Sequence, residues 1–327
     1  MKDGISNPTR NRFLGCLTGL ALGDAVGCAV EFRARGKFEP LTDMIGGGKF
    51  QLEQGQWTDD TSMSLCLAHS LIEQGGFDAK DQMDRYIKWF DEGYMSCKSK
   101  GFGIGKQTAR AIGRYIKSGD PFAGSDEPNQ AGNGALMRIA PIPMYYFGNL
   151  ELAREMGIKS SITTHGCSEV CDTSSLFVKM LFKALHGRSK DEILCSWVHT
   201  ESQKIRSICL SDYKEKTEDE ISSSGYVVNS LEAALWAFSS TNDFESAILK
   251  VANLGDDSDT TAAICGQLSG AYYGYDTLPK HWLVPLYKRD LIVDTADRLY
   301  QLNANVVYDF SEQFVGDSLE ETLMSSY

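Results

Sequence analysis

The stretch RFLGCLTGLALGDAVGCAVEF, residues Arg12 to Phe32, decides the fold. Its glycines at positions 15, 19, 23 and 27 are four residues apart, so on a helix they form one smooth stripe. A second stretch, residues 262–274, carries small residues at positions 262, 266, 270 and 274. Helices with matching stripes can approach each other closely. We therefore predict that the two segments are neighbours in a central pair, which would bring Asp24 and Glu31 near Asp257.

The rest of the chain repeats the helical period, and alternating patterns of a length useful for strands are nearly absent. We predict helices over residues 61–74, 81–94, 107–118, 151–163, 169–185, 191–198, 229–238, 244–251, 259–273 and 286–302. The charged, serine-rich residues 200–225 are expected to form a solvated loop or helix end. The fold class is all-α: a large multi-helix orthogonal bundle, as a single domain over residues 1–327. Its core would lie at residues 12–300, and residues 303–327 would form a peripheral tail.

Charge and composition argue against several classes of function. The net charge is −12 and we expect no local patch to reverse its sign, which argues against a nucleic-acid groove. No segment reaches the roughly 18 uninterrupted apolar residues of a membrane span. The nine cysteines are odd in number and lie mostly within apolar helical patterns, which indicates reduced, buried thiols. We expect a cytoplasmic protein that binds neither nucleic acid nor membrane.

Two acidic clusters of similar composition each open a predicted helix. They are Trp57-Thr58-Asp59-Asp60-Thr61 and Asn253-Leu254-Gly255-Asp256-Asp257-Ser258-Asp259-Thr260-Thr261. Carboxylates this crowded repel one another unless a cation, a helix N-terminus or protonation relieves them. Six side chains offer hard oxygen ligands that suit Mg²⁺, Mn²⁺ or Ca²⁺ rather than zinc, namely Thr58, Asp59, Asp60, Asp257, Asp259 and Thr260. Four carboxylates balance two divalent cations, so we predict a binuclear centre; the alternative is that each aspartate caps a helix.

Two glycine-rich loops and one histidine are further candidates for ligand contacts. The loop Gly101-Phe102-Gly103-Ile104-Gly105 precedes a predicted helix, so it can offer backbone N–H groups to a phosphate or can be a plain turn. The bend Gly132-Asn133-Gly134 with Arg138 can hold a ribose or phosphate, or can be a tight turn with Arg138 in an ion pair. His165 can contact a substrate or can end a helix as its C-cap.

With these motifs the sequence resembles the ADP-ribosylglycohydrolase family, the dinitrogenase-reductase-activating-glycohydrolase-like enzymes. The matching blocks follow in order, as Gly15–Glu31, Trp57–Met63, Gly132–Arg138 with Pro141, Thr164-His165 and Leu254–Gly274. The resemblance covers roughly residues 12–300. It implies the family's all-helical fold and two Mg²⁺ ions, or Mn²⁺ in their place, held by the six oxygen ligands named above.

The resemblance also implies an enzyme. It would be a hydrolase that cleaves the glycosidic bond between ADP-ribose and a modified acceptor and so reverses mono-ADP-ribosylation. Glu31 or Asp60 would exchange protons with water or the leaving group, and which of them is the base stays open. Contacts to the substrate would come from Asp24, Gly101, Gly103, Gly105, Gly132, Asn133, Gly134, Met137, Arg138 and His165. Its partner would be an ADP-ribosylated protein or a small ADP-ribose conjugate.

One departure from the family pattern concerns the acceptor. Arginine-specific relatives often carry an Asp in the loop before the Ile-Gly pair, where this chain has Gly103. The linkage is therefore open between arginine and an O-linked acceptor such as serine or an ester. Two rival functions are a metal-dependent hydrolase of phosphate esters and a non-catalytic ADP-ribose-binding protein. The complete set of six ligands argues against the second.

Overall fold

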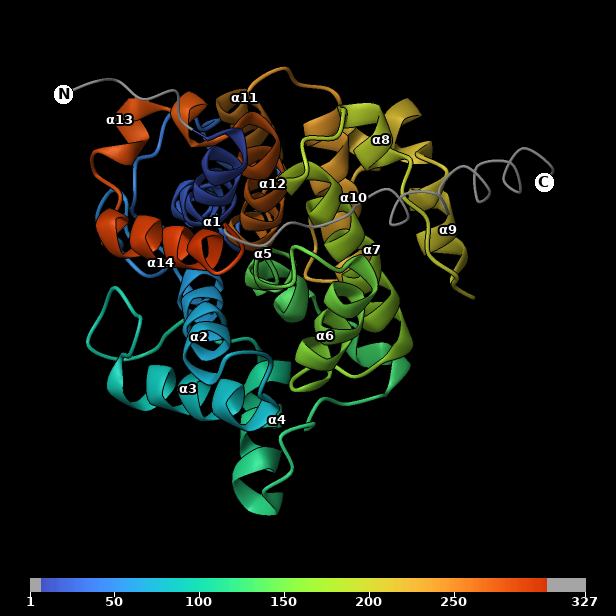
Figure 1. Ribbon diagram of the computed structural model, residues 1–327. Helices are drawn as coiled ribbons and strands as arrows, with labels where there is room; N and C mark the ends of the chain where they lie inside the picture. Colours follow the sequence, from blue (N-terminus) through green and yellow to red (C-terminus); the bar gives the residue numbers. More distant parts are fainter. Residues whose placement is uncertain (1–6, 305–327) are drawn as a thin grey trace.

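The computed structural model describes residues 7–304 and is built from helices (Figure 1). Its α-helices are α1 (Pro8–Gly27), α2 (Asp59–Gln74), α3 (Ala79–Glu92), α4 (Lys106–Ser118), α5 (Pro141–Tyr145), α6 (Leu150–Ile162), α7 (Ser168–Leu185), α8 (Lys190–Leu194), α9 (Gln203–Cys209), α10 (Val227–Ser239), α11 (Phe244–Ala252), α12 (Ser258–Tyr273), α13 (Lys280–Leu283) and α14 (Arg289–Gln301). The described residues form no strand, only isolated bridges. The all-α prediction is confirmed.

Helices α1 and α12 lie side by side (Figure 1). They are antiparallel, and their stripes of small residues are in contact. A Cβ atom added at Gly15 would lie 2.1 Å from the carbonyl oxygen of Gly270, and one at Gly19 would lie 2.4 Å from that of Gly266. Positions 23 and 27 meet the first turns of α12 in the same way. Because no side chain fits between the two backbones, glycine is required along this line. The predicted pairing is confirmed, and it sets the C-terminal end of α1 beside the N-terminal end of α12.

A third helix end joins this junction. α2 begins directly after Thr58, whose backbone N–H donates to the carboxylate of Asp24 on α1 at 2.9 Å. The first residue of α12, Ser258, donates its hydroxyl proton to the carbonyl of Gly27. The N-terminal ends of α2 and α12 therefore meet at the end of α1. Both are the positive ends of helix dipoles, so the junction favours negative groups.

Most predicted helices are present within a few residues of the predicted ends, with three corrections. The first helix ends at Gly27 rather than Phe32, because the chain turns after Cys28 and the Phe32 N–H donates to the carbonyl of Asp256. The helix predicted over 191–198 ends at Leu194. Residues 200–225 are not simply a solvated loop, because they contain α9 and two 3₁₀ turns.

Other expectations from composition have mixed outcomes. No helix among residues 7–304 is long and apolar enough to cross a membrane. All nine cysteines are free, and only Cys171 and Cys195 are not buried. The expectation that no patch reverses the negative charge is wrong, since residues 94–119 contain six lysines and arginines and no acid. Beyond residue 304, the predicted tail lies outside the described residues.

Candidate active site

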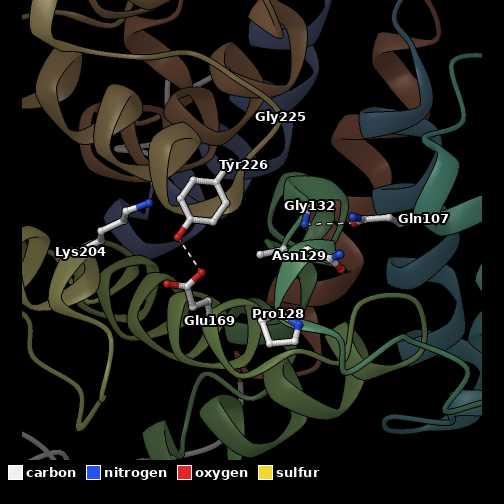
Figure 2. A pocket seen from close by; sticks show the side chains of 9 residues that line it. Gln107, Pro128, Asn129, Gly132, Glu169, Lys204, Gly225 and Tyr226 are labelled. Carbon is white, nitrogen blue, oxygen red and sulfur yellow. Dashed lines mark hydrogen bonds between the residues drawn. The ribbon is translucent and has the colours of Figure 1, made fainter.

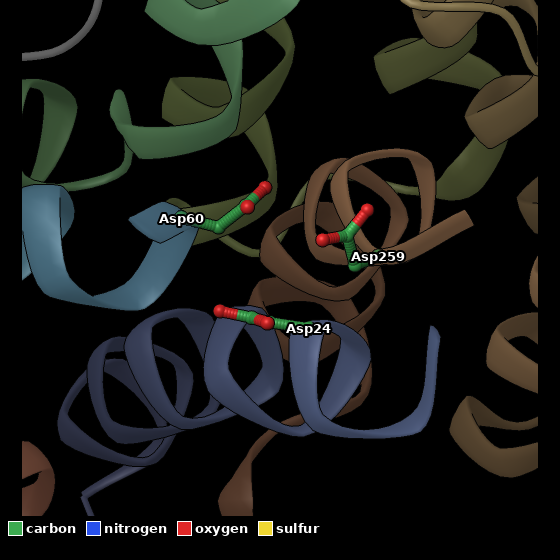
Figure 3. Close-up of side chains that lie close together, drawn as sticks. All are labelled: Asp24, Asp60 and Asp259. Atoms are coloured by element: carbon green, nitrogen blue, oxygen red, sulfur yellow. The ribbon is translucent and has the colours of Figure 1, made fainter. Parts of the chain in front are cut away.

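Three carboxylates from three helices converge where α1, α2 and α12 meet. They are Asp24 of α1, Asp60 of α2 and Asp259 of α12, and they face one another in Figure 3. One oxygen of each lies within 4.8 Å of the others, and all three side chains are buried. We call these residues the inner triad.

A second group of carboxylates shares one member with the first. Oxygens of Glu31, Asp257 and Asp259 also lie within 4.8 Å of one another, and we call these residues the outer triad. Glu31 comes from the turn after α1, and Asp257 precedes α12 and is half-buried. The fold thus brings the two acidic clusters of the sequence together through Asp259. The outer triad is the more open of the two.

Asp24 holds the start of α2 in place. Its carboxylate accepts from the backbone N–H groups of Thr58 (2.9 Å) and Thr61 (3.0 Å), and from their hydroxyls at 2.9 and 2.6 Å. Asp24 is fully buried, so the expected contact with substrate does not fit this geometry. Its carboxylate acts as an N-cap supplied by another helix, and it belongs with the carboxylates of the centre.

Helix capping does not explain the aspartates of the two clusters. The N-cap residues of α2 and α12 are Thr58 and Asp257, and neither side chain makes a capping hydrogen bond. The Thr58 hydroxyl instead lies 2.9 to 3.3 Å from oxygens of Asp24, Asp60 and Asp259. A hydroxyl has a single proton and can donate to only one of them at a time. Oxygens have therefore gathered here beyond what the protein's own protons satisfy.

Burial raises the pKa of every carboxyl group in the centre. It raises the pKa of Asp24 to about 6, although the hydrogen bonds from Thr58 and Thr61 oppose the change. The pKa values of Glu31 and Asp59 rise to about 8, chiefly through burial and further through neighbouring carboxylates. The same causes raise the pKa of Asp60 and of Asp259 well above the ordinary range. Without a cation, these groups cannot all be ionised at neutral pH.

The residues fit divalent cations that prefer oxygen ligands. Asp60 Oδ1 and Glu31 Oε2 are buried and have no hydrogen-bond partner among the described residues. Each belongs to a different triad. A hard cation in each triad would bind these atoms and offset the repulsion between carboxylates. The donor set contains oxygen only, as Mg²⁺ and Mn²⁺ prefer.

The remaining candidate ligands border the triads. Asp59 is 7% exposed and lies against Gly103, where an added Cβ would be 2.4 Å from Asp59 Oδ1. Gly103 has φ +82°, so both its backbone and its neighbour exclude other residues. The Thr260 side chain hydrogen-bonds to Asp257, and its backbone N–H donates to Asp259 Oδ1 at 2.8 Å. Asp59 and Thr260 therefore both lie near Asp257 of the outer triad.

Asn133 orients a carboxylate of the outer triad. It lies in the 3₁₀ helix Asn133–Arg138, and its Nδ2 donates to Asp257 Oδ2 at 2.7 Å and to the Ser230 hydroxyl at 2.9 Å. The Gly132 N–H donates to Gln107 Oε1. The Gly132–Gly134 bend is thus fastened between the metal-binding candidates and the first turn of α4.

Two of the predicted substrate contacts are interior residues. Arg138 is fully buried, donates to the carbonyl of Gly134 and the hydroxyl of Thr164, and packs over the ring of Tyr86. Met137 is buried as well. Both side chains lie in the interior, and their expected contact with the substrate stays a prediction. Arg138 braces the bend that carries Asn133.

His165 lies directly under that bend and is neutral. Its ring approaches the positions that Cβ atoms would take at Gly132 and Gly134, at 3.2 and 2.9 Å. Burial lowers its pKa to about 3, and the nearby guanidinium groups of Arg138 and Arg114 lower it further. Its Nδ1 lies 2.8 Å from the Thr164 hydroxyl. His165 can therefore offer Nε2 as a hydrogen-bonding group but carries no charge at neutral pH.

The loop before α4 places backbone groups at the edge of the centre. Gly101 donates its N–H to Phe90 on α3, and Gly105 is the N-cap of α4 and has no side chain to cap the first turn. The adjoining lysines and arginines of residues 94–119 add positive charge. This loop and helix end can accept an anionic group such as a phosphate.

A pocket of about 460 Å³, whose lining residues Figure 2 shows, adjoins Asp257 of the outer triad. Its lining includes Gln107, Gly132, Glu169, Lys204 and Tyr226. Gly225, also in the lining, lies against Asp257, since an added Cβ would be 3.1 Å from Asp257 Oδ2. The Tyr226 hydroxyl donates to Glu169 at 2.6 Å. The pocket is of a size that holds a small ligand next to the carboxylates.

Comparison with known proteins assigns the family. The sequence profile of ADP-ribosylglycohydrolases matches residues 6–306. This chain belongs to the ADP-ribosylglycohydrolase family. The glycohydrolase is 40% identical to the ADP-ribosylarginine hydrolase Tri1 of Serratia proteamaculans, over 88% of this chain and 78% of that protein. It is 32% identical to the ADP-ribosyl-[dinitrogen reductase] glycohydrolase of Rhodospirillum rubrum, over 84% and 90%.

A solved structure supports the same assignment. A chain of an ADP-ribosylglycohydrolase-related protein complex matches with a TM-score of 0.80 and 39% identity, over 90% of this chain and 98% of that chain. The family resemblance seen in the motifs is confirmed. The protein is an enzyme that hydrolyses glycosidic bonds of ADP-ribose.

Several residues that line the pocket were not singled out from the sequence. Glu169 belongs to a predicted helix, Lys204 and Gly225 belong to the predicted loop over residues 200–225, and Tyr226 directly follows that loop. No local pattern marked them, since they meet only in the folded chain. Thr61 carried a signal, because it lies in the first acidic cluster, but its bond to Asp24 depends on the crossing of α1 and α2.

Proposed function

We propose that this glycohydrolase removes ADP-ribose from arginine side chains of modified proteins in the cytoplasm, with two Mg²⁺ ions, or Mn²⁺, in its centre. The observation that carries the proposal is the pair of overlapping carboxylate triads joined by Asp259. A single buried carboxylate would not indicate a metal site. Two adjoining sites with only oxygen ligands are the arrangement of a binuclear centre.

The two sites divide the ligands between them. Thr58, Asp60 and Asp259 would hold one ion, with Asp24 fixing the start of α2 behind them. Asp257, Asp259 and Thr260 would hold the other, with Asp59 at the edge. When bound, the ions would orient the ribose hydroxyls and make water more acidic.

Glu31 is the better candidate for proton exchange with the reacting groups. It lies in the outer triad, is 6% exposed and keeps Oε2 without a protein partner. Asp60 also keeps one oxygen without a partner, but it lies deeper at 1% exposed, and its Oδ2 accepts from Thr58. The pKa of Glu31, raised by burial and neighbouring acids, suits a group that gains and loses a proton near neutral pH.

The rest of ADP-ribose would extend away from the centre into the pocket of Figure 2. The backbone around Gly103 and Gly105 and the first turn of α4 would face the diphosphate. Gly132, Gly134 and the neutral His165 form the adjoining wall. Nothing lies within 4 Å of a Cβ added at Gly105, so the ligand can approach the backbone there, whereas Gln107 and His165 fill the space beside Gly132 and Gly134.

Arginine is the acceptor that the relatives favour. The similar proteins of Serratia and Rhodospirillum are named for ADP-ribosylarginine and for ADP-ribosylated dinitrogen reductase. The absence of an Asp at position 103 keeps an O-linked acceptor as the alternative, since no carboxylate can stand there.

A substrate panel tests the proposal. Purified protein with Mg²⁺ is given arginine-, serine- and ester-linked ADP-ribose, and free ADP-ribose is measured by chromatography. We expect release from the arginine conjugate, none after EDTA treatment, and recovery with Mg²⁺ or Mn²⁺. Release from the serine or ester conjugate alone would establish the alternative acceptor. Release of phosphate without glycosidic cleavage would contradict the glycohydrolase function, and activity unaffected by EDTA would contradict the metal centre.

A further inference from the structure

A chain of aromatic rings and lysines lies at the edge of the centre. Lys49 Nζ lies 4.2 Å from the centroid of the Phe32 ring and 5.8 Å from that of Phe50. Phe50 packs edge-on against Phe102 at 5.1 Å, and Lys98 Nζ lies 4.8 Å from the Phe102 ring. We call these five residues the rim cluster.

The rim cluster joins the neighbours of two site carboxylates. Phe32 follows Glu31 directly, and Phe102 precedes Gly103, which abuts Asp59. The pocket of Figure 2 adjoins the centre at a different place, where Gly225 lies beside Asp257. The rim cluster therefore borders the centre at Glu31 and Asp59, where the leaving acceptor has to be accommodated if ADP-ribose fills the pocket.

Phe32 is held in a costly conformation without burying its ring. Its backbone has φ +62°, and its side chain is 58% exposed. Its N–H donates to the carbonyl of Asp256, which also has a positive φ (+52°), and the Asp256 N–H donates to Arg33. A bulky residue in this region costs on the order of 1–3 kcal/mol. Packing does not repay that cost, so a role for the exposed ring is the simplest explanation.

Lys49 shows what the exposed ring attracts. It comes directly after Gly46-Gly47-Gly48 and lies within the loop that reciprocal backbone hydrogen bonds between Gly47 and Leu52 close. Within residues 7–304, its ammonium group has no hydrogen-bond or ion-pair partner, and it lies near the faces of the two rings. The ammonium thus marks a position where the ring face stabilises a cation.

We propose that the face of Phe32 binds the guanidinium group of the arginine acceptor, which takes the place of the Lys49 ammonium. This inference rests on the proposed function. A planar guanidinium stacks on an aromatic face and is less strongly hydrated than an ammonium, so it is the better partner for the ring. The stacking would supply recognition that a carboxylate cannot supply at Gly103.

Substitutions at position 32 separate stacking from bulk. Phe32→Leu keeps an apolar side chain but removes the ring, and we expect kcat/KM for arginine-linked ADP-ribose to fall about 3- to 30-fold. Phe32→Trp should match or exceed the original enzyme, because indole binds cations best. Phe122→Leu is the matched control, since Phe122 is also exposed but lies outside the rim cluster, and its activity should stay within about twofold.

Lys49→Met should change kcat/KM in the opposite direction to Phe32→Leu. Removing the competing ammonium should raise kcat/KM for the arginine conjugate about two- to fivefold, through a lower KM. A role for Lys49 in holding the loop alone would predict a decrease.

Binding of ADP-ribose itself is the second readout, because this product lacks the acceptor. Calorimetry with Mg²⁺ should give equal Kd values for the original enzyme and Phe32→Leu, within about twofold. A much weaker Kd would show that Phe32 only positions the Asp256 loop, and would overturn the inference. So would unchanged hydrolysis by Phe32→Leu, or a Phe32→Trp variant as slow as Phe32→Leu. If the original enzyme releases nothing from the arginine conjugate, the proposed function has failed and this inference fails with it.

Discussion

The inner and outer triads share Asp259 but differ in what surrounds them. In the inner triad, Asp24 receives four hydrogen bonds from Thr58 and Thr61, and every carboxylate is buried. In the outer triad, Glu31 keeps a bare oxygen, and Asp257 is half-buried beside the pocket. The Asp24 carboxylate is thus fixed by the fold, whereas Asp60 and Glu31 each keep an unpartnered oxygen, and of these two Glu31 lies in the more open triad.

This difference suggests a division of labour. Hydrogen bonds that fix a carboxylate lower its freedom to move or to exchange protons, which suits a ligand or a support. A carboxylate with an unused oxygen and a raised pKa suits proton transfer. We infer that the inner triad sets the geometry and the outer triad meets the substrate.

The largest effect is expected at the shared residue. Asp259→Asn removes a negative charge from both triads, so we expect activity to fall at least about 10³-fold and stabilisation by Mg²⁺ to be lost. Activity assays and melting curves with and without Mg²⁺ measure both. Asp256→Asn, an exposed acid three positions earlier, is the control and should change activity by less than about twofold. Retained Mg²⁺ stabilisation in Asp259→Asn would disprove a shared ligand.

Glu31→Gln tests the outer triad by itself. The amide cannot accept or release a proton in the reaction, so activity should fall about 10²- to 10⁴-fold. The free energy of unfolding should stay the same or rise, because a buried acid is removed. Denaturant titration without metal measures it. A large loss of stability would assign Glu31 a structural role instead.

Asp24→Asn makes the opposite test on the inner triad. The new amide group would face the N–H and hydroxyl donors of Thr58 and Thr61, so we expect a loss of about 2 kcal/mol or more in stability. Activity should fall with the folded fraction and through displacement of α2. If Asp24→Asn unfolds at the same denaturant concentration as the original enzyme, the support role is wrong.

Asn133→Ala examines the link between the outer triad and the bend at Gly132. Asp257 would lose a hydrogen bond of 2.7 Å that orients its carboxylate. We expect a 10- to 100-fold weaker affinity for the activating metal, measured by titration of activity against Mg²⁺ or Mn²⁺. Excess metal should restore most of the activity. An unchanged titration curve would place Asp257 outside the metal site.

The smallest expected effect is the change in the free energy of unfolding with each pH unit, counted for a single acid. Acids whose pKa is raised in the folded state hold protons that the unfolded chain has already lost, so stability without metal should fall as pH rises from about 4.5 toward 8. The expected slope is about 1.4 kcal/mol per pH unit for each such acid. Saturating Mg²⁺ should flatten the slope, because the cation favours the ionised forms. Stability that rises with pH in the absence of metal would contradict the crowding of acids.

Much of the framework could be predicted from the sequence because it depends on local spacing. Four-residue glycine repeats mark a close helix pair wherever they occur, and α1 and α12 met as expected. The acidic clusters were recognisable because neighbouring carboxylates repel one another unless a cation or protonation offsets their charge. The end of α1 was missed, since Phe32 turns away through a bond to Asp256, more than two hundred residues later.

What the sequence by itself determined is the kind of chemistry, through oxygen-rich clusters, and the pairing of two helices, through periodicity. Only the tertiary structure decided which acids lie close enough to share a cation, because that depends on how three helix ends cross. In the folded chain, the Asp24 carboxylate holds the start of α2, the Arg138 side chain is buried, and a pocket forms beside Tyr226. Helical periodicity follows from neighbours along the chain, whereas the convergence of Asp24, Asp60 and Asp259 follows from packing between distant segments.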